Sequence, residues 1–197
     1  MTGLRIIAGT YKGRRLLAPP GLATRPLPDR IKQSLFDWLG QDLTGSTVAD
    51  TCAGSGSFGC EAASRGATQV HLVEPSAHAL SVLRANLRGL GNPPAIVIHP
   101  RPFQAVLPTL RDLDLVFCDP PFPWYRDEPE TLTALLTLAM NALARGGQLL
   151  VRGERGETLP PLPSGLRRDD ERTYGRSWVL LLKRKEAVPP ASGPSFA

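Results

Sequence analysis

The sequence predicts an α/β fold built on a mostly parallel β-sheet with helices on both faces, and two observations support this. Between residues 47 and 151, short apolar runs alternate with longer segments whose leucines recur at helical spacing, the pattern of repeated strand–helix–strand crossovers. After residue 165, two strand-like runs flank a tight turn and predict an antiparallel C-terminal hairpin. A chain of 197 residues is long enough for one such core and short for two.

The individual elements follow from this pattern, and the strands add up to a seven-stranded sheet. The expected strands are Val48-Ala49, Gln69–Val73, Ala95–Ile98, Leu113–Cys118, Gln148–Val151, Leu166–Arg172 and Ser177–Lys183. The expected helices are Pro28–Leu39, Phe58–Arg65, a segment opened by Pro75 and closed by Gly91, and Pro129–Ala144. We expect Gly146-Gly147 to end the last helix, because glycine commonly follows a helix C-terminus.

The N-terminal segment departs from this alternation. Residues 4–18, LRIIAGTYKGRRLLA, predict a basic β-hairpin with its turn between Gly9 and Gly13. We therefore divide the chain into an N-terminal hairpin-and-helix extension (1–40), an α/β domain (41–185) and a tail (186–197). The tail is rich in Pro, Ser and Gly and is expected to be disordered, because it has little apolar surface to bury.

Positive charge is concentrated near the N-terminus of a chain whose formal net charge is +5. Residues 1–35 contain one acid, Asp29, against seven basic residues: Arg5, Lys12, Arg14, Arg15, Arg25, Arg30 and Lys32. Such asymmetry indicates a polyanionic partner, most simply nucleic acid. The candidate contacts are Lys12, Arg14, Arg15 and Arg30. A solvated basic surface without a partner fits the charge alone equally well.

Composition places the chain among soluble cytoplasmic proteins. Its hydrophobic content is 42% and its charged content 21%, and no window is long and apolar enough for a membrane span. Basic residues interrupt the N-terminus, which lacks the apolar core of a signal peptide. The cysteines, three in number, and the three histidines share no metal-ligand spacing. We expect no metal site and no membrane partner.

A glycine-rich turn follows the first strand of the alternating region. Gly54, Gly56 and Gly59 have the spacing of a dinucleotide-binding turn, and Glu74 ends the next strand. Asp50 precedes the glycines, where it suits a cationic amino-acid group and would repel a pyrophosphate. This favours S-adenosylmethionine over a nicotinamide dinucleotide. The expected cofactor contacts are Asp50, Ala53, Gly54, Ser55, Gly56 and Glu74.

A proline-rich loop, CDPPFPW at residues 118–124, follows the strand Leu113–Cys118. Two fixed φ angles would hold Asp119 and the carbonyl of Pro120 as rigid acceptors for the N–H groups of an exocyclic amine. Such acceptors would aim the nitrogen lone pair at a methyl donor, and Phe122 could stack on the base. We therefore interpret Asp119, Pro120, Pro121 and Phe122 as the catalytic residues. An ordinary proline-rich turn is the alternative.

These motifs together resemble the RsmD family, bacterial methyltransferases that act on guanine N2 in small-subunit ribosomal RNA. The resemblance rests on RIIAGTYKGRRL, TRPLPDRIKQSLFDWL, DTCAGSGSFGCEAASRGA, Glu74 and CDPPF, and it extends from Arg5 to Lys183. It implies a Rossmann-like methyltransferase fold, S-adenosylmethionine as cofactor, and 16S RNA in the small subunit or its assembly intermediate as substrate. It also implies that Arg25 lies near the active site and the RNA, where we expect it to contact the cofactor. We expect the protein to be a monomer.

Three positions depart from the family pattern. Thr51-Cys52 replaces a more usual Leu-Phe pair, Arg152 stands where the family often has an acid, and no Asp or Asn lies near Arg101 for the adenine. Two rival functions stay open. The same chemistry could act on adenine N6 in DNA or on a protein glutamine amide, and an inactive scaffold could bind ribosomes without catalysis.

Overall fold

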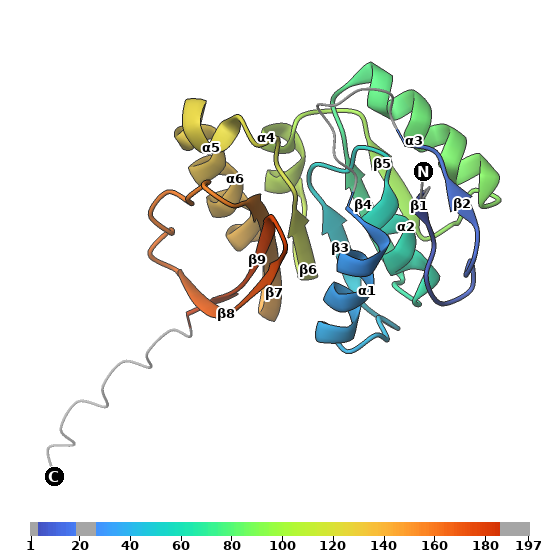
Figure 1. Cartoon of the computed structure of the whole chain (residues 1–197), viewed down its shortest axis with the longest axis horizontal. Coiled ribbons are helices and arrows are strands. Elements are labelled where there is room, and N and C mark those ends of the chain that lie inside the picture. The colour runs from blue at the N-terminus through green and yellow to red at the C-terminus, as the bar shows by residue number, and fades with distance from the viewer. Residues whose placement is uncertain (1–3, 19–26, 186–197) are drawn as a thin grey trace, which may run out of the picture.

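The computed structural model, which describes residues 4–18 and 27–185, confirms the predicted α/β fold class (Figure 1). Its main sheet has seven strands in the order β5-β4-β3-β6-β7-β9-β8. Strands β3 to β7 are mutually parallel, whereas β9 is antiparallel to both of its neighbours. The strands are β3 (Thr47–Asp50), β4 (Gln69–Val73), β5 (Ile96–His99), β6 (Leu113–Cys118), β7 (Leu143–Glu154), β8 (Leu166–Tyr174) and β9 (Ser177–Arg184).

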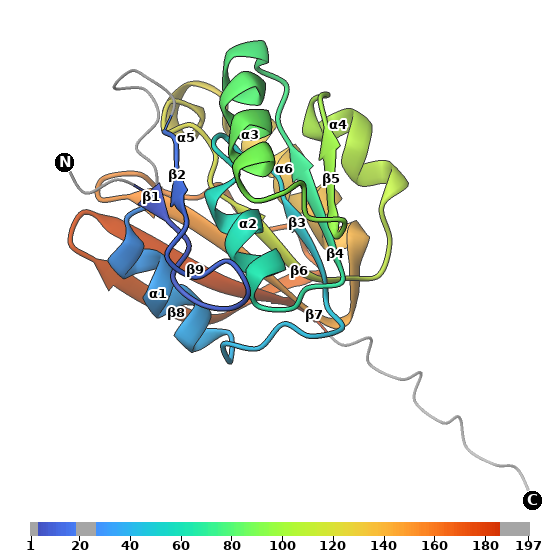
Figure 2. The same cartoon turned by 90° about the vertical axis from the view of Figure 1, so that its right-hand side faces the viewer.

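Helices cover both faces of this sheet (Figures 1 and 2). One hydrophobic cluster joins the sheet to α1 (Asp29–Trp38), α2 (Ser57–Ser64) and α3 (Ala77–Gly89). The other lies beneath α4 (Phe103–Val106), the 3₁₀-helix η1 (Leu107–Thr109), α5 (Trp124–Asp127) and α6 (Pro129–Ala142). Stripes of Leu and Ala on α3 and α6 supply the apolar faces, as the helical spacing predicts.

The N-terminal hairpin, β1 (Leu4–Arg5) and β2 (Arg15–Leu16), is antiparallel as predicted. A buried carboxylate on α2 fixes it to the rest of the fold. Glu61 accepts hydrogen bonds from the backbone N–H groups of Ile7 and Ala8 over 2.7 and 3.0 Å. It also pairs with Arg65 at 2.8 Å and Lys32 at 3.4 Å. The hairpin and α1 thereby share one core with the sheet, across the predicted boundary at residue 40.

The largest departure from the predicted boundaries lies between α6 and β7, where we expected the helix to reach Ala144 and the strand to begin at Gln148. Helix α6 ends at Ala142, and β7 begins at Leu143, before the glycines that we expected to stop the helix. A Cβ atom on Gly147 would lie 2.6 Å from the carbonyl oxygen of Leu113. The glycine is therefore needed where β7 crosses close to β6 at an irregularity in their pairing. Among the described helices, none is both long and apolar enough to cross a membrane.

Candidate active site

The carboxyl ends of β3 and β6 bring the two predicted motifs to one edge of the sheet. Asp50 is in register with Phe117, and the N–H of Thr51 donates to the Phe117 carbonyl over 3.0 Å. The glycine-rich loop leaves β3 and the proline-rich loop leaves β6, so the loops start side by side. Ligands of open α/β sheets bind at this edge. Asp50 and Asp119 are close enough for the charge of Asp119 to raise the pKa of Asp50.

The glycine-rich loop is held by Glu74 at the end of β4. One oxygen of Glu74 accepts the N–H of Gly54 over 2.8 Å, and the other accepts the N–H of Ser76 over 2.9 Å. Each oxygen keeps a further lone pair for a ligand hydroxyl. Gly56 has a φ of 77°, which a residue with a side chain rarely adopts. A Cβ atom on Gly54 would meet nothing within 4 Å, so space is open above this part of the loop.

Asp50 is buried with its charge poorly compensated. Its side chain is 2% exposed, Oδ2 accepts only a long hydrogen bond of 3.3 Å from Gly59, and Oδ1 has no hydrogen-bond partner among the described residues. Burial, followed by the charge of Asp119, raises the pKa of Asp50 to about 8. A cationic ligand group at Oδ1 would relieve both defects. The buried Asp50 carboxylate, with one oxygen left to accept hydrogen bonds, therefore fits the ammonium group of S-adenosylmethionine.

In the proline-rich loop, Asp119 forms an ion pair that the sequence did not reveal. Nη1 of Arg152, on β7, donates to Oδ2 of Asp119 over 2.8 Å. The same guanidinium lies 5.7 Å from the centre of the Phe122 ring, within the range of a cation–π contact. Sequence reasoning noted Arg152 only as a departure from a family pattern. The sequence alone carries no signal for this contact, because it depends on β6 and β7 being neighbours in the sheet.

The end of the same loop is anchored by α5. The hydroxyl of Tyr125 donates to the backbone carbonyl of Arg152 over 2.6 Å, and its ring meets Trp178 edge-on at 5.7 Å. Phe122 and Trp124 are half-buried, and the Trp124 ring lies 5.9 Å from that of Phe103. Aromatic surface therefore remains exposed beside Asp119, where a planar ligand can stack.

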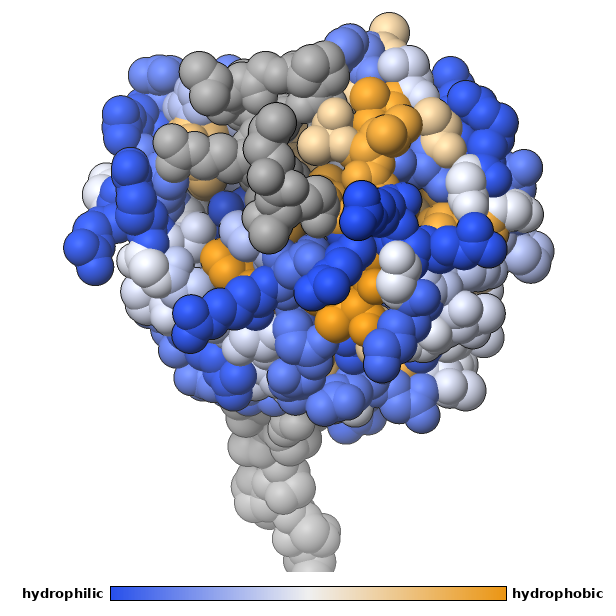
Figure 3. All heavy atoms as spheres, turned by 45° about the vertical axis from the view of Figure 1, so that its right-hand side comes forward, coloured by the Kyte–Doolittle hydropathy of each residue, from blue (hydrophilic) through white to orange (hydrophobic). Residues whose placement is uncertain are grey.

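The four predicted RNA contacts lie on and beside the hairpin. All are exposed, and none of their side chains forms a hydrogen bond or ion pair with another residue in the described part of the chain; they are Lys12, Arg14, Arg15 and Arg30. The face that carries the hairpin is covered mostly by hydrophilic side chains (Figure 3). Because these four side chains are exposed and unpaired within the described residues, their charges are available to a polyanion. The predicted contact Arg25 lies outside the described residues.

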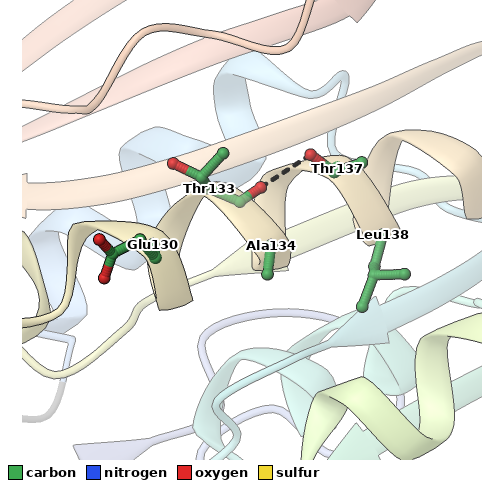
Figure 4. A pocket seen from close by; sticks show the side chains of 5 residues that line it. All are labelled: Glu130, Thr133, Ala134, Thr137 and Leu138. Atoms are coloured by element: carbon green, nitrogen blue, oxygen red, sulfur yellow. Dashed lines mark hydrogen bonds between the residues drawn. The ribbon is translucent and has the colours of Figure 1, made fainter.

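A separate surface hollow of about 450 Å³ is lined by a single helix, α6 (Figure 4). Its lining residues are Glu130, Thr133, Ala134, Thr137 and Leu138. The dashed line in Figure 4 is a hydrogen bond along the helix, from the Thr137 hydroxyl to the carbonyl of Thr133 at 2.8 Å. The hollow holds one carboxylate and none of the residues described above, so it is not part of the site at the sheet edge.

Known proteins resemble this chain over nearly its whole length. Residues 4–183 match the family described as conserved hypothetical protein 95. Ribosomal RNA small subunit methyltransferase D of Escherichia coli is 30% identical over 188 residues, which is 92% of this chain and 90% of that protein. A Bacillus subtilis protein named as a candidate ribosomal RNA methyltransferase is also 30% identical, over 92% of this chain and 100% of that protein. A solved Escherichia coli structure, named as a candidate methyltransferase, superposes with a TM-score of 0.79 at 27% identity and covers 94% of this chain and 99% of that one.

Proposed function

The chain belongs to the RsmD family of ribosomal RNA methyltransferases, and we propose that it transfers a methyl group from S-adenosylmethionine to the exocyclic N2 amine of a guanine in 16S ribosomal RNA. One observation carries this proposal. Adjacent parallel strands set an acidic, glycine-lined cradle beside a carboxylate-and-aromatic loop at one edge of the sheet. A methyl donor and an amine acceptor need such neighbouring sites.

The cofactor would lie along the ends of β3 and β4. When bound, S-adenosylmethionine supplies an electrophilic methyl group on a sulfonium centre. Asp50 would hold its ammonium group, because Oδ1 is buried without a partner. Glu74 would accept the ribose hydroxyls through its remaining lone pairs. The open space at Gly54 leaves room for the backbone there to approach the ligand. We propose Ala53, Ser55 and Gly56 of the same loop as further contacts.

The substrate base would enter against the proline-rich loop. Oδ1 of Asp119 accepts no hydrogen bond from a described residue, so it can accept one N–H of the amine while the Pro120 carbonyl accepts the other. These acceptors would aim the nitrogen lone pair at the methyl group and place a proton acceptor beside it. The half-buried Phe122 ring would stack on the base after it has left its helix.

The basic hairpin would supply the sequence-independent part of RNA binding. Lys12, Arg14 and Arg15 are exposed and free of partner carboxylates within the described residues, which suits contacts with phosphates. We propose that the RNA is presented in the small subunit or its assembly intermediate, in the cytoplasm, and that the protein acts as a monomer.

The proposal is tested by methyl transfer from labelled S-adenosylmethionine to several substrates. Small subunits, free 16S RNA, DNA and a glutamine-containing release factor would be prepared without methyl marks and compared. We expect label in RNA, at a guanine that nuclease digestion and mass spectrometry identify as N2-methylated. Label confined to DNA or protein would favour one of the rival amine substrates. Absence of cofactor binding with retained ribosome binding would favour a non-catalytic module.

Replacement of Asp119 tests the catalytic role directly. Asp119→Ala should reduce kcat by about a hundredfold or more, because the acceptor that orients the amine is lost. Its affinity for S-adenosylmethionine, measured by calorimetry, should change little. Because the variant leaves Arg152 buried without its anion, its fold is checked by circular dichroism, and the isosteric Asp119→Asn serves as the milder comparison. Normal turnover by the folded Ala variant would contradict the role.

A further inference from the structure

We infer that Arg152 is a positioning residue for methyl transfer, which keeps Asp119 ionised and turned so that one of its oxygens faces the substrate amine. This inference rests on the proposed function. Strands β6 and β7 are parallel, and Cys118 is in register with Val151. Asp119 directly follows β6 and Arg152 is the next residue of β7, so the two residues meet at the carboxyl edge of the sheet. The resulting contact joins Nη1 to Oδ2 at 2.8 Å.

The Arg152 side chain is buried, so its charge depends on this contact for compensation. The side chain is 3% exposed, compared with 18% for Asp119. A guanidinium group so buried needs an anion nearby, because an uncompensated charge is strongly disfavoured away from water. Within the described residues, Asp119 is the one carboxylate that it contacts. Its other terminal nitrogen donates to the Ser177 hydroxyl over 3.2 Å, and Nε has no partner.

The contact changes both the charge and the orientation of Asp119. Burial raises the pKa of this carboxyl, whereas the positive charge and the hydrogen bond of Arg152 lower it. Arg152 therefore opposes protonation, which would convert an acceptor oxygen into a donor. The hydrogen bond also occupies Oδ2 alone. Oδ1 is left as the acceptor for the amine, in an orientation that a free carboxylate would have to adopt at an entropic cost.

The same guanidinium group also contacts the aromatic wall of the site. Its central carbon lies 5.7 Å from the centre of the Phe122 ring. One side chain thus touches both the acceptor and the stacking surface of the proline-rich loop. The ion pair is neutral overall, so Asp119 can approach an RNA without repelling its phosphates as a lone carboxylate would. An arginine fulfils this role better than a lysine, because its planar fork contacts several groups at once.

Other titratable groups surround Asp119, and a test must distinguish their titration from that of Asp119. They are Asp50 on β3, the thiols of Cys52 and Cys118, and the Tyr125 hydroxyl on α5, and the charge of Asp119 raises the pKa of each. The Cys118 thiol has a pKa of about 12 and stays neutral at physiological pH. Asp50, with a pKa of about 8, is the group whose titration could be mistaken for that of Asp119.

The experiment compares Arg152→Gln and Arg152→Lys with the wild-type full-length chain. Carbon-detected NMR titration of the carboxyl groups, assigned with Asp119→Asn and Asp50→Asn, reports the pKa of Asp119 independently of activity. We expect that pKa to rise in Arg152→Gln and to rise less in Arg152→Lys. The acid limb of kcat/KM should move to higher pH in parallel, kcat should fall about tenfold or more, and the KM for S-adenosylmethionine should change little.

Two comparisons isolate the contact itself. Arg145→Gln removes an exposed arginine from the opposite end of β7 and should leave the pH profile unchanged. In the Asp119→Asn background, Arg152→Gln should cost little further activity, because the two residues act as a unit.

If Arg152→Gln does not fold, the same measurements are made on Arg152→Lys. An unchanged Asp119 pKa together with additive losses would overturn the inference. Failure of the wild type to methylate RNA would instead overturn the proposed function, while the titration would still decide the role of Arg152.

Discussion

Asp50 carries an energetic penalty in the folded chain that a bound cation would relieve. Its carboxyl group is buried, and this burial is the main cause of a pKa near 8 in place of the ordinary 3.8. Between these two pH values, the folded chain holds a proton at Asp50 that the unfolded chain has released. The free energy of unfolding therefore falls as the pH rises through this window. Active sites commonly sacrifice stability in this way.

Asp50→Asn should consequently stabilise the protein at alkaline pH. The amide is uncharged, so the variant escapes the destabilisation that the wild type accumulates up to a pH of about 8. We expect the variant to gain a few kcal/mol at a pH of about 9 and almost nothing near pH 4, because each pKa unit corresponds to about 1.4 kcal/mol. Urea titrations at several pH values measure the difference. The same variant should lose affinity for S-adenosylmethionine in calorimetry. Parallel stability curves for the two proteins would contradict this account.

The sequence could predict Asp50 and Asp119 as site residues because each ends an apolar run before a turn of unusual composition. It could not predict the partner of Asp119. Arg152 lies 33 residues further along the chain, and their contact depends on β6 and β7 being neighbours in the sheet. Periodicity identifies strands but says little about which strands pair. The unpartnered oxygen of Asp50 was equally hidden, because only the packing around β3 reveals it.

At the scale of single elements, the RIIAG segment is explained by how the hairpin docks on α2. Gly9 approaches this helix so closely that a Cβ atom would lie 1.7 Å from the carbonyl oxygen of Ser64. The N–H of Thr10 donates to that same oxygen over 2.8 Å. Together with the backbone bonds to Glu61, this contact orients the basic hairpin. The motif is therefore structural, because it orients the hairpin whose cations we propose as RNA contacts.

Gly9→Ala and Gly13→Ala form a matched pair that tests this docking. Both glycines have positive φ angles, of 77° and 84°, but a Cβ atom on Gly13 would meet nothing within 4 Å. We expect Gly13→Ala to cost about 1 kcal/mol from backbone strain alone. Gly9→Ala should cost several kcal/mol, because the hairpin must also move away from α2. Denaturant titration gives both values, and equal costs would show that the close approach to Ser64 does not matter.

The exposed cations of the hairpin should control the salt dependence of RNA binding. Arg14→Gln combined with Arg15→Gln should weaken binding to 16S RNA and reduce the slope of log affinity against log salt concentration by about 1 to 2. A control with the same change in net charge combines Arg145→Gln and Arg168→Gln, two exposed residues near the amino edge of the sheet. If both double variants alter the slope equally, net charge alone, and not the hairpin, determines binding.

The limits of a helix or strand were predictable where the residues at its ends had a single structural interpretation. The strand Gln69–Val73 and the strand Leu113–Cys118 have the predicted limits, because turn residues bound each apolar run. The end of α6 was not predictable in this way. Gly146 and Gly147 looked like a helix stop, whereas the structure uses Gly147 to let β7 pass close to Leu113. Glycine can end a helix or permit a close approach between strands, and only the position of β6 shows which of the two applies here.

At the scale of the whole molecule, the N-terminal extension and the α/β domain are packed as one body. The rings of Phe36, Phe58 and Phe117 stack in series, with centroid separations of 4.9 and 4.0 Å, and they join α1, α2 and β6. Lys32 on α1 reaches the buried Glu61 on α2. The predicted boundary at residue 40 rests on where the alternation of strands and helices begins, and this pattern carries no information about which apolar residues the two parts share.

We therefore propose that residues 41–185 do not form an independently stable unit. Removing residues 1–40 would expose Phe58 and leave Glu61 with Arg65 as its one remaining partner of those described. A buried carboxylate stripped of partners and an opened core are each destabilising by several kcal/mol, a large share of the stability of a typical domain. The shortened chain should lack the sharp thermal transition of the full chain and should bind hydrophobic dyes.

The matched control is a chain that ends after residue 185, which keeps every contact named above. Its transition temperature should equal that of the full chain, and circular dichroism and Trp fluorescence should report the same single transition. Trp38 lies on α1, whereas Trp178 lies on β9, so the fluorescence samples both sides of the boundary at residue 40. A cooperative transition in residues 41–185 at an unchanged temperature would establish that boundary as a true domain limit and would reduce the hairpin and α1 to an appendage.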